Sequence, residues 1–164
     1  MYPDVRVAAG VDVPRIDTAT RWVVGAVILD ERGRAFAQRR SPSRRLFPGC
    51  WDIVGGHVEP GETVLGALAR EIREETGWRL AEVLADLGRL VWTPDDGIER
   101  HEVDYLVRVS GDLASPALEP EKHTEFAWVT EADLAMLTVP DDPGASFVAD
   151  TVGRGLRRAR RLAG

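Results

Sequence analysis

The stretch from residue 55 to residue 78 constrains the fold of this chain more than any other part of the sequence. It starts with two adjacent glycines and continues over residues 62–77 with the apolar spacing of an amphipathic helix. Gly77 follows the last helical position, where glycine commonly ends a helix. Three large apolar residues share one face of this predicted helix: Leu65, Leu68 and Ile72.

Segments on both sides of the helix have β-strand patterns. Residues 21–30 are rich in valine and isoleucine, and the turn signal at 31–33 predicts that residues 34–40 form a hairpin with them. Residues 51–54 are expected to form a short strand that leads into the glycine pair. Further strands are predicted at residues 81–93, 101–110 and 124–130, and further helices at 131–137 and about 145–162. This order predicts an α/β fold with a mixed β-sheet between helices.

The size and composition of the chain favour a single folded domain. It has 164 residues, of which 44% are hydrophobic and 29% are charged, which is enough for a core of its own. Residues 1–20 show little periodicity and are predicted to form an N-terminal arm that could carry one edge strand. Residues 21–164 are predicted to form the domain, because no repeat and no long linker divides them.

The charge and the cysteine content limit the possible partners and compartments. A formal net charge of −6 gives no overall attraction to nucleic acid or to an anionic membrane. The single cysteine, Cys50, cannot form a disulfide within the chain, which fits a reducing compartment. Because there is also no signal-peptide pattern and no apolar run of about 18 residues, we expect a cytoplasmic protein.

Three glutamates of the predicted helix suggest a metal site. Glu71, Glu74 and Glu75 stand at positions i, i+3 and i+4, which puts their carboxylates together on one exposed helix face. Carboxylates this close repel one another, and a cation relieves the repulsion. Hard divalent ions such as Mg²⁺ or Mn²⁺ prefer oxygen ligands. The alternative is a solvated helix face on which Arg70 and Arg73 neutralise the glutamates.

The spacing of the whole stretch resembles the Nudix box, G-x5-E-x7-R-E-U-x-E-E-x-G-U, in which U is a bulky apolar residue. Gly56 is followed after five residues by Glu62 and after seven more by Arg70, and the motif then runs on to Trp78. Every fixed position matches, and the one soft departure is Trp78, where an aliphatic residue is usual. The chain is therefore similar to Nudix hydrolases, and this implies an α/β/α sandwich.

The resemblance also implies roles for the residues of the box. Glu62 and Arg70 would form a structural pair that holds the loop on the helix. The implied reaction is the metal-dependent hydrolysis of a diphosphate linkage in a nucleoside diphosphate that is joined to a further group. The implied ligands of Mg²⁺ or Mn²⁺ are the backbone carbonyl of Gly56 and the carboxylates of Glu71, Glu74 and Glu75.

The general base is not fixed by the box, because related enzymes take it from the box or from a later loop. In the segment EPEKHTEFAW we favour Glu121, which lies in a loop before a predicted strand, over Glu119 and Glu125. The alternative is that Glu121 is an ordinary surface glutamate without a catalytic role. His123 in the same segment could also contribute to the site. The alternative is that it is an exposed loop histidine without a role.

The segment RRSPSRRLFPG just before the box is rich in arginine. Guanidinium groups bind phosphate oxygens well, so the candidate ligands of substrate phosphates are Arg39, Arg44 and Arg45. The alternative is that the segment is a solvated basic loop. Most aromatic side chains belong to protein cores, but four are candidates for stacking on a base: Phe47, Trp51, Trp92 and Tyr105.

These observations favour a nucleoside triphosphate pyrophosphohydrolase. The EPEK segment before a tryptophan-containing strand resembles that of some nucleoside triphosphate pyrophosphatases. Pyrophosphatases of ADP-ribose or of nucleotide sugars are the nearest alternatives, followed by a nucleotide-sensing module without turnover and by an enzyme acting on capped RNA. An isopentenyl diphosphate isomerase would need a cysteine where this chain has Gly55.

The expected partner is a small-molecule nucleotide. The C-terminal segment 154–164 holds five arginines, which predict the basic outer face of a terminal helix, with a contact for RNA or a partner protein as the alternative. Because the chain is acidic overall, we expect no stable nucleic-acid partner and no membrane association. Many Nudix relatives are dimers, so a homodimer is compatible with the sequence.

Overall fold

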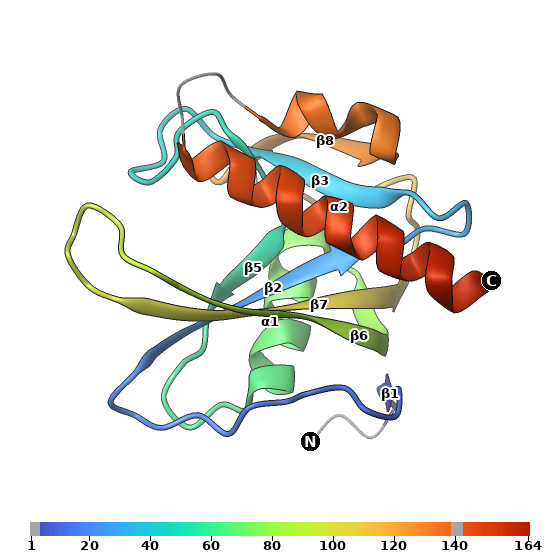
Figure 1. The fold of residues 1–164 in the computed structure, drawn as a ribbon. Helices are drawn as coiled ribbons and strands as arrows, with labels where there is room; N and C mark the ends of the chain where they lie inside the picture. Colours follow the sequence, from blue (N-terminus) through green and yellow to red (C-terminus); the bar gives the residue numbers. More distant parts are fainter. Residues whose placement is uncertain (1–3, 139–142) are drawn as a thin grey trace.

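The computed structural model describes residues 4–138 and 143–164, and its strands form two sheets (Figure 1). The strands are β1 (Arg6–Val7), β2 (Arg21–Ile28), β3 (Ala35–Arg40), β4 (Trp51–Asp52), β5 (Val54–His57), β6 (Arg79–Trp92), β7 (Arg100–Ser110) and β8 (His123–Val129). The helices are α1 (Val64–Thr76), the 3₁₀ helix η1 (Glu131–Leu137) and α2 (Pro143–Ala163). The larger sheet has the order β1-β6-β7-β2-β5, and the smaller one has the order β4-β3-β8.

The five-stranded sheet is mixed and carries a core on each face. β2 runs parallel to β7 and β1 runs parallel to β6, whereas β2–β5 and β6–β7 are antiparallel. In β2, Val24 and Ala26 pack with α1, whereas Val27 packs on the opposite side with α2 and the smaller sheet. Figure 1 shows α1 and α2 on the two sides of this sheet. The predicted α/β fold with a mixed sheet between helices is confirmed.

Helix α1 forms as its sequence predicts. Thr63 caps its N-terminus by accepting a hydrogen bond of 3.0 Å from the backbone N–H three residues later. Gly77 adopts φ 78° at the other end, and its N–H donates to the carbonyl of Arg73 at 2.9 Å. The side chains of Leu68 and Ile72 are fully buried against the sheet. The apolar face therefore fixes where the glutamates of the helix lie.

The hairpin predicted between residues 21–30 and 34–40 is present only at its turn, and the two strands do not pair along their length. The Asp30 carboxylate closes the turn by accepting the backbone N–H groups of Arg32 and Arg34 at 2.9 and 2.8 Å. Among the described residues, pairing between the two segments is limited to one β-bridge, between Leu29 and Ala35. Both edges of β2 are already occupied by β5 and β7, so β3 leaves this sheet and pairs with β4 and β8 instead.

The strand predicted at residues 51–54 is two strands in two different sheets. β4 pairs with β3, and β5 pairs with β2. Ile53 stands between them with its side chain in the core on the α2 side. Because the chain crosses from one sheet to the other at this point, the glycine pair of β5 lies next to both layers.

The N-terminal arm lies along the five-stranded sheet and carries the edge strand β1. β1 pairs with β6, and Asp12 connects the arm to two strands. The Asp12 N–H donates to Asp86 at 2.9 Å, and its carbonyl accepts from the Tyr105 hydroxyl at 2.8 Å. The boundary between arm and domain near residue 20 remains a prediction.

The C-terminal helix α2 begins at Pro143 and ends at Ala163, slightly beyond the predicted residues 145–162. Val148, Val152 and Leu156 are buried against the sheet, as the apolar spacing predicts. The helix predicted at 131–137 is present as the 3₁₀ helix η1. Over residues 4–138 and 143–164, no helix is both long and apolar enough to span a bilayer.

Candidate active site

The glutamates of α1 lie beside the glycine pair of β5. A Cβ atom added at Gly56 would overlap the carboxylate of Glu71, so the missing side chain lets this carboxylate approach the strand. The side chain of Glu71 is only 13% exposed. Burial raises the pKa of Glu71 above its usual value, and the hydrogen bond from Arg70 opposes this shift.

The three glutamates differ in exposure, so the expectation of one exposed helix face is wrong. The Glu74 side chain is 50% exposed, but Glu75 is only 7% exposed. Glu75 accepts hydrogen bonds from Gln38 Nε2 at 2.9 Å and from the N–H of Gly55 at 3.1 Å. Burial, followed by the charge of Glu71, raises the pKa of Glu75 well above its usual value. Glu75 thus connects the helix to both sheets.

Arg70 joins the glycine loop to the helix. Its Nε and Nη2 donate to the two oxygens of Glu62 at 2.8 and 2.9 Å, and Nη2 also donates to the carbonyl of His57 at 2.9 Å. Its Nη1 donates to Glu71 at 2.8 Å and to Glu74 at 3.3 Å. Hydrogen bonding between them raises the pKa of Arg70 and lowers that of Glu62. The structure therefore brings together the pair that the Nudix resemblance implies.

A cleft of about 200 Å³ opens beside these carboxylates. Gly56 and Glu75 line it together with Arg44 from the loop between β3 and β4. Phe47 and Trp92, whose ring centroids lie 6.3 Å apart, give it an aromatic wall. The cleft thus combines carboxylates, a cationic side chain and a flat apolar surface.

The structure brings one of the three predicted phosphate ligands into this cleft. Arg44 lines the cleft, whereas the Arg45 side chain is 65% exposed and lies near the acidic turn before β7. Arg39 Nη1 donates instead to Glu125 at 3.0 Å, on the smaller sheet. Two further arginines also line the cleft: Arg40, from the same arginine-rich segment, and Arg100 of β7.

The segment before β8 lies close to the helix, although Glu121 itself is exposed. Burial raises the pKa of Glu71, and the charge of Lys122 in this loop partly opposes that shift, which indicates that the loop is near the carboxylates. The role of Glu121 as general base stays a prediction. For His123 the sequence left open that it is an exposed loop residue with no role in the site. This alternative is wrong, because His123 is only 2% exposed. Burial, reinforced by the charge of Arg40, lowers the pKa of His123 to about 4.

Two of the four aromatic candidates for base stacking are in the cleft and two are not. Phe47 and Trp92 line it. Tyr105 is fully buried, with its hydroxyl bonded to the N-terminal arm, so it belongs to the core. Trp51 packs against the core on the α2 side.

Two buried acids next to the cleft escaped the sequence analysis. Glu102 and Asp104 alternate along β7 and are 6% and 2% exposed. Burial raises the pKa values of both carboxyls above their usual range, that of Glu102 further. The E-x-D pattern in the predicted strand 101–110 was the available signal. Alternation of this kind normally marks a solvated face, whereas here the smaller sheet and α2 cover it.

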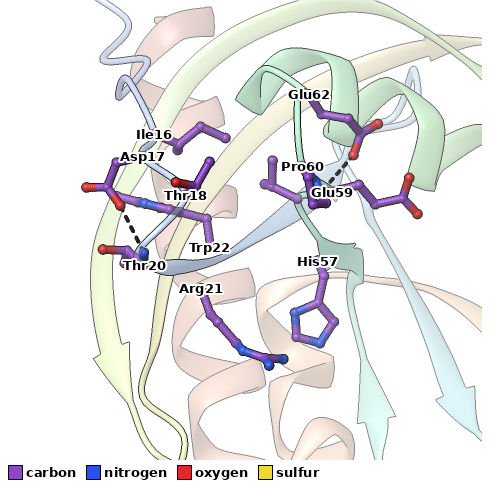
Figure 2. A pocket seen from close by; sticks show the side chains of 12 residues that line it. Ile16, Asp17, Thr18, Thr20, Arg21, Trp22, His57, Glu59, Pro60 and Glu62 are labelled. Carbon is purple, nitrogen blue, oxygen red and sulfur yellow. Dashed lines mark hydrogen bonds between the residues drawn. The ribbon is translucent and has the colours of Figure 1, made fainter.

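A larger hollow of about 660 Å³ lies between the N-terminal arm and the glycine loop. Figure 2 shows Arg21 and Trp22 on one side of it and Glu59 and Glu62 on the other. The guanidinium of Arg21 points toward His57, a residue that lines both this hollow and the cleft. The carboxylate of Glu75 opens into the smaller cleft, so we assign the chemistry to the cleft.

Comparison with known proteins gives the class of this one. The family model described as the NUDIX domain matches residues 19–150, which is most of the chain. The chain therefore belongs to the Nudix family, and it is a Nudix hydrolase. Nudix hydrolases generally act with a divalent metal ion.

Curated relatives and solved structures agree with this assignment. The chain is 35% identical over 117 residues to the nucleoside triphosphatase NudI of Escherichia coli O17:K52:H18. The aligned part covers 65% of this chain and 80% of the relative. A crystal structure of a MutT Nudix hydrolase from Burkholderia pseudomallei has 29% identity and a TM-score of 0.65, over 81% of this chain and 98% of that one. A MutT protein from Methanosarcina mazei Go1 has 26% identity and a TM-score of 0.64, over 85% and 94%.

Proposed function

We propose that this Nudix hydrolase converts nucleoside triphosphates to nucleoside monophosphates and pyrophosphate with Mg²⁺ or Mn²⁺. The observation that carries the proposal is the cleft, which Glu75 and Gly56 line together with Arg44 and an aromatic wall. Such a cleft offers a cationic group for phosphate oxygens and a flat apolar surface for a base. The name of the NudI relatives, nucleoside triphosphatase, supports this substrate class.

The chemistry of the donor set fits a divalent cation. Among the residues that the structure describes, no three carboxylate, imidazole or thiol groups already enclose a metal position. The charge of Glu74 nevertheless raises the pKa of Glu71, and the charge of Glu71 raises that of Glu75, as expected of acids that a cation would hold together. The groups that we assign as ligands are the carbonyl of Gly56 and the carboxylates of Glu71, Glu74 and Glu75.

The side chains of the site divide the work of the reaction. A bound Mg²⁺ or Mn²⁺ supplies charge neutralisation at phosphate oxygens and an acidified water. Arg44 binds and orients the phosphate chain from the opposite side of the cleft. Glu121 takes the proton of the attacking water as general base. Arg70 and Glu62 touch no reacting atom, and they position Glu71 and the glycine loop.

The first test is a substrate panel with Mg²⁺ or Mn²⁺ and products identified by mass. It includes nucleoside triphosphates, ADP-ribose and nucleotide sugars. Glu74→Gln removes an exposed carboxylate at little cost to the fold and is expected to lower kcat about 100-fold or more. Glu74 is a cleaner choice than Glu75, whose buried carboxylate accepts two hydrogen bonds.

The matched control is Arg73→Gln, which removes an exposed charge one position from Glu74 in the same helix. It should keep the wild-type kcat and the wild-type melting temperature. Near-normal turnover by Glu74→Gln would contradict the assignment of the metal-binding face. Turnover of ADP-ribose or of a nucleotide sugar in preference to every triphosphate would replace the proposed substrate class.

A further inference from the structure

Glu102 forms part of the cleft, and Asp104 lies two residues further along the same strand. Glu102 lines the cleft directly. Asp104 stands opposite Gly25, which in turn stands opposite Gly55, and both glycines line the cleft as well. A Cβ at Gly25 would overlap Asp104 Oδ1, so this oxygen lies in the space that a side chain of β2 would otherwise fill. The missing side chains of these two glycines therefore leave room for the Asp104 carboxylate beside the cleft that Glu102 lines.

The arginines of the cleft are turned to other partners. Arg40 donates to the carbonyl of Leu46 and to Asp52, at 2.9 and 3.0 Å. Arg100 donates to both oxygens of Asp96, at 2.9 and 2.7 Å. Neither hydrogen bond reaches the acid pair. The pair is thus buried beside cationic groups that neutralise other carboxylates.

One proton shared by the two carboxyls leaves acceptors toward the cleft. Burial, followed by the charge of Asp104, raises the pKa of Glu102, and burial also raises the pKa of Asp104, so the pair as a whole retains a proton at a pH where exposed carboxyls have lost theirs. The shared proton bonds Glu102 to Asp104. Asp104 Oδ1 is fully buried and has no hydrogen-bond partner in the described part of the chain. A buried oxygen of this kind needs a donor from a ligand.

The aromatic wall limits what that ligand can be. Trp92 and Phe47 line the same cleft as Glu102, and a flat ring can stack on them. A ligand that is flat and also carries an N–H₂ donor at its edge is a nucleobase with an exocyclic amino group. Cytosine, adenine and guanine have such a group, whereas uracil and hypoxanthine carry a carbonyl acceptor in the corresponding position.

We propose that Glu102 and Asp104 bind the exocyclic amino group of the nucleobase, so that the enzyme prefers nucleoside triphosphates with amino-bearing bases. This inference rests on the proposed function, since it concerns the base end of the same substrate. A site that is built to accept a hydrogen bond rejects an analogue that presents an acceptor there, because two acceptors are then left unpaired. Glu102 and Asp104 set specificity, and the reacting phosphate lies elsewhere in the cleft.

Two pairs of substrates isolate the amino group. CTP and UTP differ at position 4 of the pyrimidine, and ATP and ITP differ at position 6 of the purine, in each case by an amino group against a carbonyl. For the wild type, kcat/KM should be at least about tenfold higher for the amino member of at least one pair, mainly through KM. Ratios near one in both pairs would overturn the inference.

Two variants of Glu102 test the residue itself. Glu102→Leu removes both the proton and the acceptor, and the ratio of kcat/KM values within the preferred pair should fall to within about threefold of one. Glu102→Gln keeps a donor for Asp104 and an acceptor for the ligand, so it should keep most of the preference. If the Glu102→Leu variant keeps the wild-type ratio of kcat/KM values between the two substrates, the inference is also overturned. Should this variant fail to fold, Asp104→Asn serves in its place.

Binding of products separates this inference from the proposed function. Calorimetry with CMP and UMP, or with AMP and IMP, measures the amino preference without turnover. A wild type that hydrolyses no triphosphate but binds the amino member more tightly through Glu102 would overturn the proposed function alone. A Glu102→Leu variant that loses a bound Mn²⁺ while keeping its base preference would show that the pair is a cation site, against the inference.

Discussion

At the scale of single residues, the site depends on one guanidinium. Arg70 donates five hydrogen bonds, to both oxygens of Glu62, to the carbonyl of His57, to Glu71 and to Glu74. A planar group with five donors can do this, and a lysine ammonium cannot. Arg70 therefore holds the loop before the helix and contacts two carboxylates of the proposed metal site, Glu71 and Glu74.

Arg70→Lys is expected to lower stability and activity together. The loss of the paired bonds to Glu62 should lower the free energy of unfolding by about 1–3 kcal/mol. The kcat should fall about 10- to 100-fold, because Glu71 is no longer held in place. Urea unfolding and steady-state kinetics measure the two effects. Arg73→Lys on the same helix is the matched control and should change neither.

Glu62→Gln tests whether the two residues act as a pair. It should destabilise the protein in the same way, and the double variant should lose less than the sum of the single losses, because the residues share one interaction. Strict additivity in urea unfolding would show that Glu62 and Arg70 act independently.

The sequence predicted these residues unequally. The pairing of Glu62 with Arg70 came from the Nudix spacing, because the two positions are eight residues apart and only the loop geometry brings them together. Glu102 and Asp104 could not be predicted, because alternating polar residues in a strand do not tell whether a second layer covers them. The burial of Glu75 was missed for the same reason, since Gln38 that covers it lies in the other sheet.

At the scale of elements, the short strand β5 decides how close α1 can come to β2. Its two glycines face different neighbours. A Cβ at Gly55 would overlap the backbone carbonyl of Val24 in β2, whereas a Cβ at Gly56 would overlap the flexible Glu71 side chain. The helix and the strands around it were predicted well, because their apolar periodicity is local. The placement of β3 and β4 in a second sheet was not predicted, because it depends on which strand edges are already occupied.

Alanine at the two glycines should therefore have different effects. Gly55→Ala has to separate two paired strands and should destabilise the protein by about 1–3 kcal/mol. In a domain of this size, each kcal/mol lowers the melting temperature by about 2–4 °C. Gly56→Ala should displace the Glu71 carboxylate, so that kcat falls by about tenfold or more while the melting temperature changes less than in Gly55→Ala. Thermal unfolding and kinetics of both variants check this, and an equal loss of melting temperature in the two would contradict it.

At the scale of the whole molecule, the cleft exists because two layers meet at one end of the five-stranded sheet. α1 brings Glu75 from one face, and the loop between β3 and β4 brings Arg44 from the other. The acids of both layers thus gather in one buried place, and the repulsion among them opposes folding. Asp52 of β4 raises the pKa values of Glu75, Glu102 and Asp104 alike. Binding of a divalent cation would offset this repulsion in the working enzyme.

This crowding makes stability depend on pH in a direction that can be tested at Glu102. Burial raises the pKa of Glu102 from 4.5 to about 10, so the folded state holds a proton that the unfolded state releases. A raised carboxyl pKa stabilises the fold fully below the unfolded value of 4.5, and this contribution is lost as pH rises toward about 10. Several charged groups share this cleft with Glu102: Asp104 in its own strand, Asp52, His57, Glu75, Arg40, Arg44 and Arg100, with Arg154 of α2 acting on Asp104.

Glu102→Gln removes the titrating group but keeps its shape and one donor. Relative to the wild type, the variant should therefore gain melting temperature at pH 8. The gain should be smaller at pH 5, because this pH lies close to the unfolded pKa of 4.5 and less of the free-energy penalty for holding the proton has built up. A gain of about 1 kcal/mol at pH 8 corresponds to about 2–4 °C. Thermal unfolding of the metal-free protein at the two pH values measures the difference, and Glu99→Gln on the exposed turn before β7 is the control. An effect of Glu102→Gln that is equal at both pH values would mean that the carboxyl is ionised in the folded state, and the acceptor-rich pair proposed for base recognition would then lack its shared proton.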